Sequence, residues 1–478
     1  MRLEELLKGC KGISANSKEV YPGYIFVAIR GTQVDGHSFV REALERGAVA
    51  VLVERDVGIE DPRIIRVEDT KKALGELSSL FYGEPSKALK VIGITGTNGK
   101  TTSTHIVESI LNTAGIKTGL IGTIYYRLGE KIYEYEGRTT PDPIKWHSTL
   151  AEMRKEEAKV VVCEVSSHAL DQKRVWGTVF HTVAFTNLSQ DHLDYHQTME
   201  DYFLAKARLF TEYEYQHALI NADDPWGKRL ISMAKKVKTY GKEGDLKMLD
   251  FSTGLEGSRL KVEYEGKEYT FYSNLRGGFQ AYNLSLGILL GFLWSLSPEV
   301  IQEGIKEVHV PGRFETYKGN GFMVVVDYAH TPDALEKVLR TAKALAKNRL
   351  IAVFGAGGNR DRTKRPLMGK VAEELAELVI LTSDNPRFEE PMAIIEDILA
   401  GIKDKSKSAF VASSLVSSSF SSNFFYMAIY LAFYSMLSKA ISMACATLLA
   451  SSFPSFSSNN CNTSMVKCDM VKILDQIL

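Results

Sequence analysis

VIGITGTNGKTT, residues Val91–Thr102, is the stretch that decides the fold of this chain. The apolar run Leu89–Thr95 predicts a buried strand of about six residues. A helix is expected over Thr102–Ala114, with Gly115 just past its C-cap. A strand, a glycine-rich turn and a helix in this order point backbone N–H groups and a positive helix end at a phosphate. The turn itself consists of Gly96, Thr97, Asn98, Gly99, Lys100 and Thr101.

Side chains in this turn suit nucleotide binding. Lys100 adds a point charge, and Thr101 supplies a hydroxyl for Mg²⁺. The usual phosphate loop has a glycine where this chain has Ile94, so we interpret the turn as a shortened variant. The alternative is a glycine-rich turn that only connects two elements. The Gly-Lys-Thr sequence after a strand, with acids downstream, favours nucleotide binding.

Composition limits the class of protein. A length of 478 residues predicts roughly three domains, and 45% hydrophobic with 24% charged residues is typical of a soluble globular protein. The formal net charge is zero, which argues against a nucleic-acid partner held by bulk charge. The five cysteines lack the spacing of a disulfide framework or a metal site. The first residues lack the apolar core of a signal peptide, so we expect a cytoplasmic enzyme.

Residues 1–86 alternate short strands and helices. Strands are predicted at Tyr24–Ile29 and Val49–Val53, and helices at Phe39–Arg46 and Asp69–Tyr82. The segment 83–86 is interpreted as a linker. This region carries no catalytic cluster. A substrate-docking domain is therefore expected, and a purely structural cap is the alternative.

Acidic and histidine side chains follow the predicted strands of residues 87–311. The strand Lys159–Glu164 ends in an acid, and strand C-termini line the ligand crevice of an α/β sheet. Glu164 is thus expected beside the phosphate loop as a Mg²⁺ ligand; a solvent-exposed glutamate is the alternative. The strand Thr182–Phe185 leads into an Asp- and His-rich segment, 191–196, that favours metal or phosphate chemistry over a solvated turn. On spacing alone, Lys206 in the predicted helix Tyr202–Phe210 is an ordinary helix lysine.

Strands and helices alternate again after residue 312. Strands are predicted at Val324–Val326, Leu350–Phe354 and Leu378–Thr382, with helices between them. The glycines after Phe354 fail the spacing of a dinucleotide-binding motif.

The amino-acid composition changes in residues 404–478. Between Ser408 and Met465 the only charged residue is Lys439. Phe424–Leu449 is almost wholly apolar and long enough for a membrane span. A frameshifted reading frame is our leading interpretation of this tail. A real membrane tail and a divergent soluble ending are the alternatives.

An ordered series of motifs resembles one family. The motifs include GTNGKTT, TTPD (Thr139–Asp142), EVSSHALDQKR (Glu164–Arg174), TNLSQDHLDYH, DYAHTPDALE, FGAGGNRDRTKRPLMG and DNPRFEEP. They occur in the order found in Mur ligases, and over about residues 1–402 the chain is similar to the UDP-N-acetylmuramoyl-tripeptide synthetases among them.

This resemblance implies an α/β fold of three domains. Residues 1–86 would form a small UDP-substrate domain, and 87–311 a central P-loop-type ATPase domain with a mostly parallel sheet. Residues 312–403 would form a Rossmann-like amino-acid-binding domain, followed by the atypical tail 404–478. Family members continue with DR-x-x-AI and GKGHE segments, and neither follows Lys403 here. The amino-acid site is therefore expected to be incomplete.

The reaction implied by the resemblance is ATP-driven amide formation. The D-Glu carboxylate of UDP-MurNAc-L-Ala-D-Glu takes the γ-phosphoryl group of ATP, and the amine of meso-2,6-diaminopimelate attacks the acyl phosphate. A carboxylate is a poor electrophile, and phosphorylation turns its oxygen into a good leaving group. ATP and two Mg²⁺ sites are implied, together with a monomer whose partners are these small molecules. No nucleic acid is expected, and no membrane unless the run 424–449 is a genuine span.

The resemblance also assigns roles to residues of this chain. The expected catalytic residues are Lys100, Glu164, His192 and Lys206, with Lys206 carbamoylated. The expected metal ligands are Thr101, Glu164, His192 and Lys206. The expected ATP contacts are Gly96, Thr97, Asn98, Gly99, Lys100, Thr101, Thr102, Asn283, Arg313 and Asp327. The expected contacts to the UDP-muramoyl-dipeptide are Ser17, Thr32, Gln33, Val34, Thr139, Thr140, Ser166, Gln172 and Arg174.

The DNPR motif bears on the incoming amino acid. The expected contacts are Arg360, Asp384, Asn385, Pro386 and Arg387. Arg387 can bind the distal carboxylate of diaminopimelate through two N–H groups, and lysine has no carboxylate there.

Two further functions stay open at this point. The chain could be another amide ligase of the same superfamily, such as a folylpolyglutamate synthase, although the N-terminal domain and DNPR argue against it. It could also be a catalytically impaired nucleotide-binding homologue, disabled by its tail.

Overall fold

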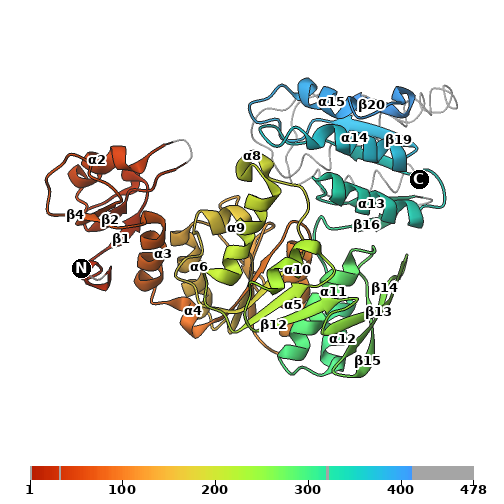
Figure 1. Cartoon of the computed structure of the whole chain (residues 1–478), viewed down its shortest axis with the longest axis horizontal. Coiled ribbons are helices and arrows are strands. Elements are labelled where there is room, and N and C mark those ends of the chain that lie inside the picture. Colours follow the sequence, from red (N-terminus) through yellow and green to blue (C-terminus); the bar gives the residue numbers. More distant parts are fainter. Residues whose placement is uncertain (1–2, 32–33, 319–321, 412–478) are drawn as a thin grey trace, which may run out of the picture. The chain divides into compact units, whose positions relative to one another are not determined.

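The computed structural model (Figure 1) describes residues 3–31, 34–318 and 322–411. The chain divides into two compact units, with the division between Phe314 and Glu315. None of the helices in the described ranges combines the length and apolarity needed to cross a membrane. The apolar run Phe424–Leu449 and most of the predicted tail lie outside these ranges.

The first unit begins with a four-stranded parallel sheet covered on both faces. Its strands lie in the order β1–β2–β3–β4. Residues of helix α2 pack with Phe26 and Val51, whereas residues of α3 pack with Ile25 and Leu52. Successive strand residues point to opposite faces, so the two helices cover opposite sides. The elements are β1 (Gly12–Ser14), β2 (Tyr24–Val27), α2 (Val40–Glu45), β3 (Ala50–Val53), β4 (Ile64–Arg66) and α3 (Thr70–Phe81).

An 11-stranded sheet forms the rest of this unit. Strand β5 (Lys90–Thr95) lies inside it, between β9 (Val160–Glu164) and β10 (Phe180–Phe185), and pairs in parallel with both. The parallel part continues through β11 (His217–Asn221), β12 (Val237–Gly241) and β13 (Leu246–Gly254) on one side, and β6 (Thr118–Ile121) on the other. Antiparallel strands complete both edges: β14 (Gly257–Tyr264) and β15 (Lys267–Ser273), then β7 (Tyr126–Leu128) and β8 (Lys131–Tyr133). The prediction of a mostly parallel central sheet is confirmed.

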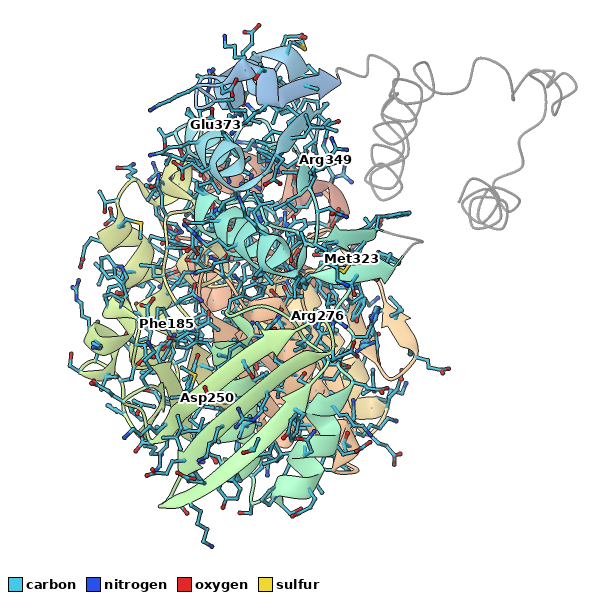
Figure 2. All side chains as sticks on the ribbon, turned by 90° about the vertical axis from the view of Figure 1, so that its right-hand side faces the viewer. Phe185, Asp250, Arg276, Met323, Arg349 and Glu373 are labelled. Atoms are coloured by element: carbon cyan, nitrogen blue, oxygen red, sulfur yellow. The ribbon has the colours of Figure 1, made fainter. Side chains whose placement is uncertain are left out.

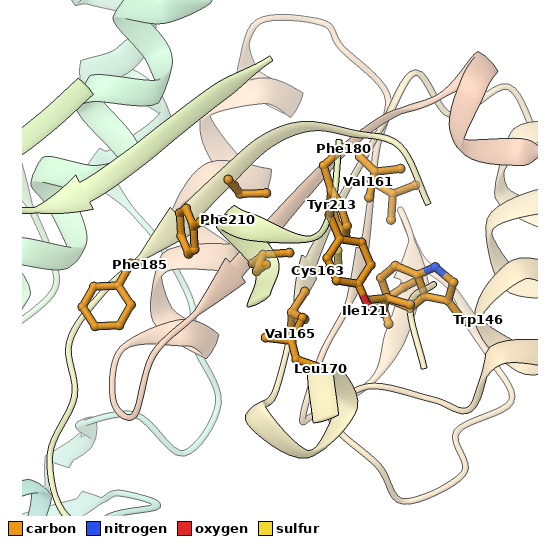
Figure 3. Close-up of a cluster of buried hydrophobic side chains, with 14 of the residues drawn as sticks. Ile121, Trp146, Val161, Cys163, Val165, Leu170, Phe180, Phe185, Phe210 and Tyr213 are labelled. Carbon is orange, nitrogen blue, oxygen red and sulfur yellow. The ribbon is translucent and has the colours of Figure 1, made fainter. Parts of the chain in front are cut away.

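Each face of this sheet has its own apolar core. Helices α6 (Pro143–Lys155) and α9 (Met199–Thr211) contribute to the core on one face, which includes Trp146, Cys163 and Phe180. Figure 3 shows these three side chains in that cluster. Helices α5 (Lys100–Thr113), α11 (Gln280–Leu293) and α12 (Pro298–Lys306) pack on the other. Asp250 lies on the long strand β13, which pairs with β12 and β14 (Figure 2). Because both faces are buried, the central strands are continuous apolar runs.

The second unit alternates strands and helices. A parallel sheet has the order β18–β19–β20, and an antiparallel pair, β16–β17, precedes it. The elements are β16 (Glu315–Lys318), β17 (Met323–Val326), α13 (Pro332–Leu345), β18 (Ile351–Phe354), α14 (Lys364–Leu375), β19 (Leu378–Thr382), α15 (Pro391–Leu399) and β20 (Ser408–Val411). Strand β20 lies beyond residue 403, where the sequence places the end of this domain, so the sheet continues into the predicted tail.

Several elements differ from the sequence-based expectation. Helix α5 begins at Lys100 rather than Thr102, because Gly99 is its N-cap in the left-handed region. The predicted linker 83–86 enters a helical turn, α4 (Pro85–Ala88). Strands β6–β8 and helix α6 were not predicted, since the strands are short and the helix is only weakly amphipathic. The remaining α-helices of the first unit are α1 (Leu3–Leu6), α7 (Ser167–Asp171), α8 (Leu193–His196) and α10 (Pro225–Ile231).

Candidate functional site

The phosphate loop joins β5 to α5 and needs its glycines. Gly96 and Gly99 have φ of 146° and 88°, in the region that side chains disfavour. A Cβ on Gly96 would collide with the Thr186 hydroxyl, and one on Gly99 with the Asn283 side chain. Both positions therefore allow a close approach that only glycine permits.

Two lysines converge on one carbonyl of this loop. The Nζ atoms of Lys100 and Lys206 each donate to the Gly96 carbonyl oxygen at 2.8 Å, and Lys100 also donates to the Thr97 carbonyl oxygen. Lys206 is 1% exposed and lies over the ring of Tyr202. Burial lowers the pKa of both ammonium groups. The predicted Lys206 thus lies against the predicted ATP loop, although their positions in the sequence are far apart.

Glu164 ends β9 in a buried network of hydroxyl and amide donors. Its carboxylate accepts from the Thr101 hydroxyl at 3.1 Å. It also accepts from Thr123, from the backbone N–H at 2.8 Å and from the hydroxyl at 3.0 Å. Sequence reasoning missed Thr123. Predicting β6, whose C-terminal end adjoins that of β9, would have placed this loop beside Glu164.

His192 lies next to an acid rather than in a ready-made metal cluster. Its backbone N–H donates to Asp191 at 2.9 Å, and its Nε2 is 3.3 Å from the other Asp191 oxygen. Burial lowers the pKa of His192 to about 2, so its imidazole is neutral at ordinary pH. Within the described ranges no group of three or more His, Cys, Asp or Glu side chains is arranged to hold a metal ion. The expected ligand set contains only Glu164 and His192 of these types, the other two being a hydroxyl and a lysine.

The side chains predicted to hold the dipeptide gather beside Glu164. The hydroxyl of Thr139 is 3.0 Å from that of Thr123, and the hydroxyl of Thr140 donates to the Glu164 backbone oxygen. Arg174 donates to the Thr140 backbone oxygen and to the Gln172 side chain. The hydroxyl of Thr140 also accepts from the Ser166 backbone N–H.

The residues predicted to hold uridine lie in the N-terminal sheet region. Ser17 is buried and donates to Glu42 at 2.7 Å. Val34 is 58% exposed. Thr32 and Gln33 lie outside the described residues.

Two further predicted ATP contacts reach the phosphate loop in the first unit. Asn283 accepts from Ser103 of α5 at 3.3 Å. Arg313 donates to the Thr101 hydroxyl at 3.1 Å. Thr102 is buried in the first turn of α5. Asp327 belongs to the second unit, directly after β17, and is half-buried.

In the second unit, the loops after β18 and β19 bind each other. The Gly358 N–H donates to the Asn385 backbone oxygen at 2.8 Å, and the Phe388 N–H donates to the Asn359 side chain at 3.0 Å. The Asn385 side chain accepts from the Arg387 N–H. Arg387 is exposed with a φ of 53°, and Arg360 is half-buried. The predicted contacts Arg360, Asp384, Asn385, Pro386 and Arg387 thus share one edge of the sheet.

Three family models match this chain in sequence order. They are the Mur ligase family catalytic domain at residues 10–82, the Mur ligase middle domain at 94–291 and the Mur ligase glutamate ligase domain at 312–417. The third match extends past residue 403, as β20 does.

Known proteins are similar over most of the chain. A UDP-N-acetylmuramoyl-L-alanyl-D-glutamate--2,6-diaminopimelate ligase of Aquifex aeolicus is 62% identical over 408 residues, covering 85% of this chain and 84% of that protein. The protein of the same name in Clostridium perfringens is 44% identical and covers 83% of this chain and 84% of its own length. A solved structure of a ligase with this name superposes with a TM-score of 0.65 at 33% identity and covers 85% of each chain.

These similarities agree with the sequence-based interpretation. The predicted three-domain α/β fold and the predicted ATP-dependent ligase class are confirmed by the matching domains and by the relatives named as ligases. The chain belongs to the Mur ligase family.

Proposed function

We propose that this chain joins meso-2,6-diaminopimelate to the D-Glu carboxylate of UDP-MurNAc-L-Ala-D-Glu at the expense of ATP. The names of the relatives at 62% and 44% identity support this assignment. The structural observation that carries it is the meeting of Lys100 and Lys206 on the Gly96 carbonyl oxygen beside the Thr101–Glu164 pair. Such a site concentrates positive charge and oxygen ligands where a phosphoryl group would transfer.

ATP would bind with its phosphates on the loop 96–102. The N–H groups at the start of α5 and the positive helix end favour the phosphates. Lys100 now donates to two loop carbonyls, and a phosphate oxygen would be a stronger, charged acceptor for the same ammonium group. Asn283, Arg313 and Asp327 would complete the nucleotide contacts.

The residues around Glu164 suit Mg²⁺. The Thr101 hydroxyl and the Glu164 carboxylate are 3.1 Å apart and both buried, and oxygen is the ligand type that Mg²⁺ prefers. His192 would belong to a second site. Its lowered pKa keeps the imidazole neutral, so one ring nitrogen is unprotonated and can bind a cation. Bound Mg²⁺ would neutralise phosphate charge during transfer.

Lys206 is proposed to be carbamoylated. Two ammonium groups on one carbonyl oxygen repel each other, and burial lowers the pKa of Lys206, which favours the neutral amine. The neutral Nζ forms a bond to the carbon of CO₂ and releases a proton, giving a carbamate whose oxygens can bind a cation. The carbamate would then attract the Lys100 ammonium group and Mg²⁺.

The reaction would proceed in two steps. The D-Glu carboxylate oxygen attacks the γ-phosphorus, and ADP leaves. The amine of diaminopimelate then attacks the acyl carbon, phosphate leaves, and the nitrogen loses a proton. Thr139, Thr140, Ser166, Gln172 and Arg174 would orient the dipeptide, with Ser17 and the turn of Thr32, Gln33 and Val34 on the uridine part. Arg360 and the 384–387 loop would hold the amino acid.

A substrate panel tests this function. Purified full-length chain receives ATP with UDP-MurNAc-L-Ala-D-Glu or with dihydropteroate, and diaminopimelate, lysine or glutamate as the amine. We expect an amide product only with the muramoyl dipeptide, with diaminopimelate preferred. Product from dihydropteroate and glutamate would instead identify a folylpolyglutamate synthase, and nucleotide binding without any product would identify an impaired homologue.

Dependence on CO₂ tests the carbamate of Lys206. We expect ligase activity to fall in CO₂-depleted buffer and to recover with bicarbonate, and the Lys206→Arg variant to lose about 100-fold in rate, because a guanidinium cannot form the carbamate. Native mass spectrometry should find the added CO₂ on wild-type protein. Activity that is indifferent to CO₂ would reject the carbamate.

The domain boundaries, the oligomeric state and the cellular location are proposals as well. We propose domains at 1–86 and 87–311, a third domain that begins at 312 and extends past the expected end at 403 to include β20, a monomer, and a cytoplasmic location suited to nucleotide-linked small-molecule substrates. Size-exclusion chromatography with light scattering tests the monomer.

A further inference from the structure

Arg365 lies at the start of α14 and is the charged side chain that joins both loops of the amino-acid region. It is 0% exposed. Its Nη1 donates to Glu389 at 2.9 Å and to Asp397 at 2.8 Å. Its Nη2 donates to the second Glu389 oxygen at 2.9 Å and to the Gly357 backbone oxygen at 3.2 Å. We call Arg365, Glu389 and Asp397 the arginine clasp.

This clasp ties the two loops that carry Arg360 and Arg387. Gly357 belongs to the loop after β18, whereas Glu389 belongs to the loop after β19. Glu389 also accepts from the Asn359 backbone N–H, so its carboxylate is shared between Arg365 and the first loop. Asp397 anchors the guanidinium to α15. One buried guanidinium therefore sets the spacing of both loops.

The arginine clasp is a buried contact close to an exposed loop tip. Phe388, at the tip, is 96% exposed, and the Arg387 side chain next to it is exposed as well. The hydrogen bonds of Asn385 and Asn359 already described also hold the tip. A buried, bidentate charge pair keeps its geometry far better than an exposed one, because water does not compete for it.

We propose that Arg365 is a positioning residue that sets amino-acid specificity, by holding Arg387 at the distance from Arg360 at which both can face one dicarboxylic amino acid. The inference rests on the proposed function, since it names the element that orders the diaminopimelate contacts. Arg365 itself is buried and acts through the loops. Its loss should therefore weaken selection of the distal carboxylate and leave ATP use intact.

Steady-state kinetics of the full-length chain test this role. We expect Arg365→Met to raise KM for diaminopimelate at least about tenfold, with KM for ATP within about twofold of wild type, because misplacing a binding group by a small distance has effects of this size. The preference for diaminopimelate over lysine should shrink, as it should in the reference variant Arg387→Ala. Arg365→Lys keeps the charge but loses the two parallel hydrogen bonds of the guanidinium to Glu389. Its KM for diaminopimelate should lie between those of wild type and Arg365→Met.

Arg362 provides the matched control. It also pairs with Asp397, yet its side chain is 62% exposed, and the interaction described between it and Glu389 is one of charge alone. Arg362→Gln should leave both KM values and the preference for diaminopimelate unchanged. An equal rise of all KM values in Arg365→Met, or the same change in Arg362→Gln, would overturn the proposal.

Limited proteolysis supplies a readout that needs no catalysis. Trypsin cuts after Arg387, and cutting at the exposed Lys347 gives an internal reference within the same unit. We expect Arg365→Met to raise the ratio of Arg387 cleavage to Lys347 cleavage several-fold, and Arg362→Gln to leave it unchanged. If wild type forms no amide with diaminopimelate, the proposed function fails, while an unchanged cleavage ratio in Arg365→Met independently rejects the clasp.

Discussion

Thr123 controls the carboxylate of Glu164 through both its backbone and its side chain. The N–H holds one carboxylate oxygen, and the hydroxyl holds the other, which also accepts from Thr101. The carboxylate is thereby fixed in one orientation before any cation binds. Such supporting contacts commonly matter almost as much as the ligand itself.

Replacing Thr123 with valine should show what the hydroxyl contributes, apart from any effect on folding. Valine has nearly the same shape, so the backbone contact stays, and the contacts of the hydroxyl with Glu164 and with Thr139 are lost. We expect the Mg²⁺ concentration for half-maximal activity to rise about 10- to 100-fold. Thr123→Ser keeps the hydroxyl and should stay close to wild type. Equal Mg²⁺ requirements in the two variants would remove Thr123 from this role.

The phosphate loop is a segment whose shape tolerates little substitution at its glycines. Its first glycine faces the Thr186 hydroxyl, which itself donates to the Asn98 backbone oxygen at 2.7 Å. Added bulk at Gly96 would push the loop away from the strand end that supports it. The carbonyl that receives both lysines would move with it.

Gly96→Ala should therefore weaken nucleotide binding while the domain stays folded. We expect at least about a tenfold weaker affinity for ATP, measured by calorimetry, since the N–H groups no longer converge on the phosphates. Gly129→Ala is the matched control, because Gly129 also has a positive φ but has open space around it. ATP affinity retained in Gly96→Ala would show that the loop can absorb the methyl group.

The arginine clasp should also make the stability of the second unit depend on pH. The hydrogen bond from Arg365 and that from the Asn359 N–H lower the pKa of Glu389 from 4.5 to about 2. A folded pKa below the unfolded one means stability that is fully present above about pH 4.5 and lost as the pH falls toward 2.

Glu389→Gln should expose this dependence. The variant lacks the charge, so the difference from wild type in hydrogen-exchange protection of residues 355–361 and 383–390 should be largest near neutral pH. It should shrink between about pH 4.5 and pH 2, because wild-type Glu389 then takes up a proton. A difference that stays constant over this range would mean that the charge contributes nothing.

At the scale of the whole molecule, the two half-reactions depend on different parts of the chain. The residues proposed for phosphoryl transfer are present in this chain, whereas the GKGHE segment that the resemblance leads us to expect for binding the amino group does not follow Lys403. The third sheet nevertheless continues to β20. The predicted defect therefore concerns presentation of the amine rather than activation of the carboxylate.

The ratio of phosphate release to tripeptide formation should reveal this defect. We expect phosphate release to exceed tripeptide formation several-fold, because an acyl phosphate that meets no amine is hydrolysed. The measurement is phosphate and tripeptide from the same reaction, with a relative that carries GKGHE as control. Equal amounts would show that the amine site is complete. Sequencing the DNA of codons 400–478 provides a separate check, since a GKGHE segment in another frame would identify a frameshift.

Local sequence by itself determined much of this protein. Gly96–Thr101 predicted the phosphate loop, because chain reversal onto a helix start needs glycine at defined positions. The apolar runs predicted most of the buried strands, including β5 and β9, and the ordered motifs identified the family and its ligase chemistry. Short strands such as β7 carried too few residues for any pattern to rise above chance.

Only the tertiary structure decided which distant side chains meet. Thr123 reached Glu164 because β6 and β9 pair in parallel and end at the same edge. Lys206, an ordinary helix lysine by spacing, was brought by α9 onto the Gly96 carbonyl. Arg365 gained its role by burial between two loops. Hydrogen bonds and charge pairs act over a few ångströms, and sequence separation does not record such distances.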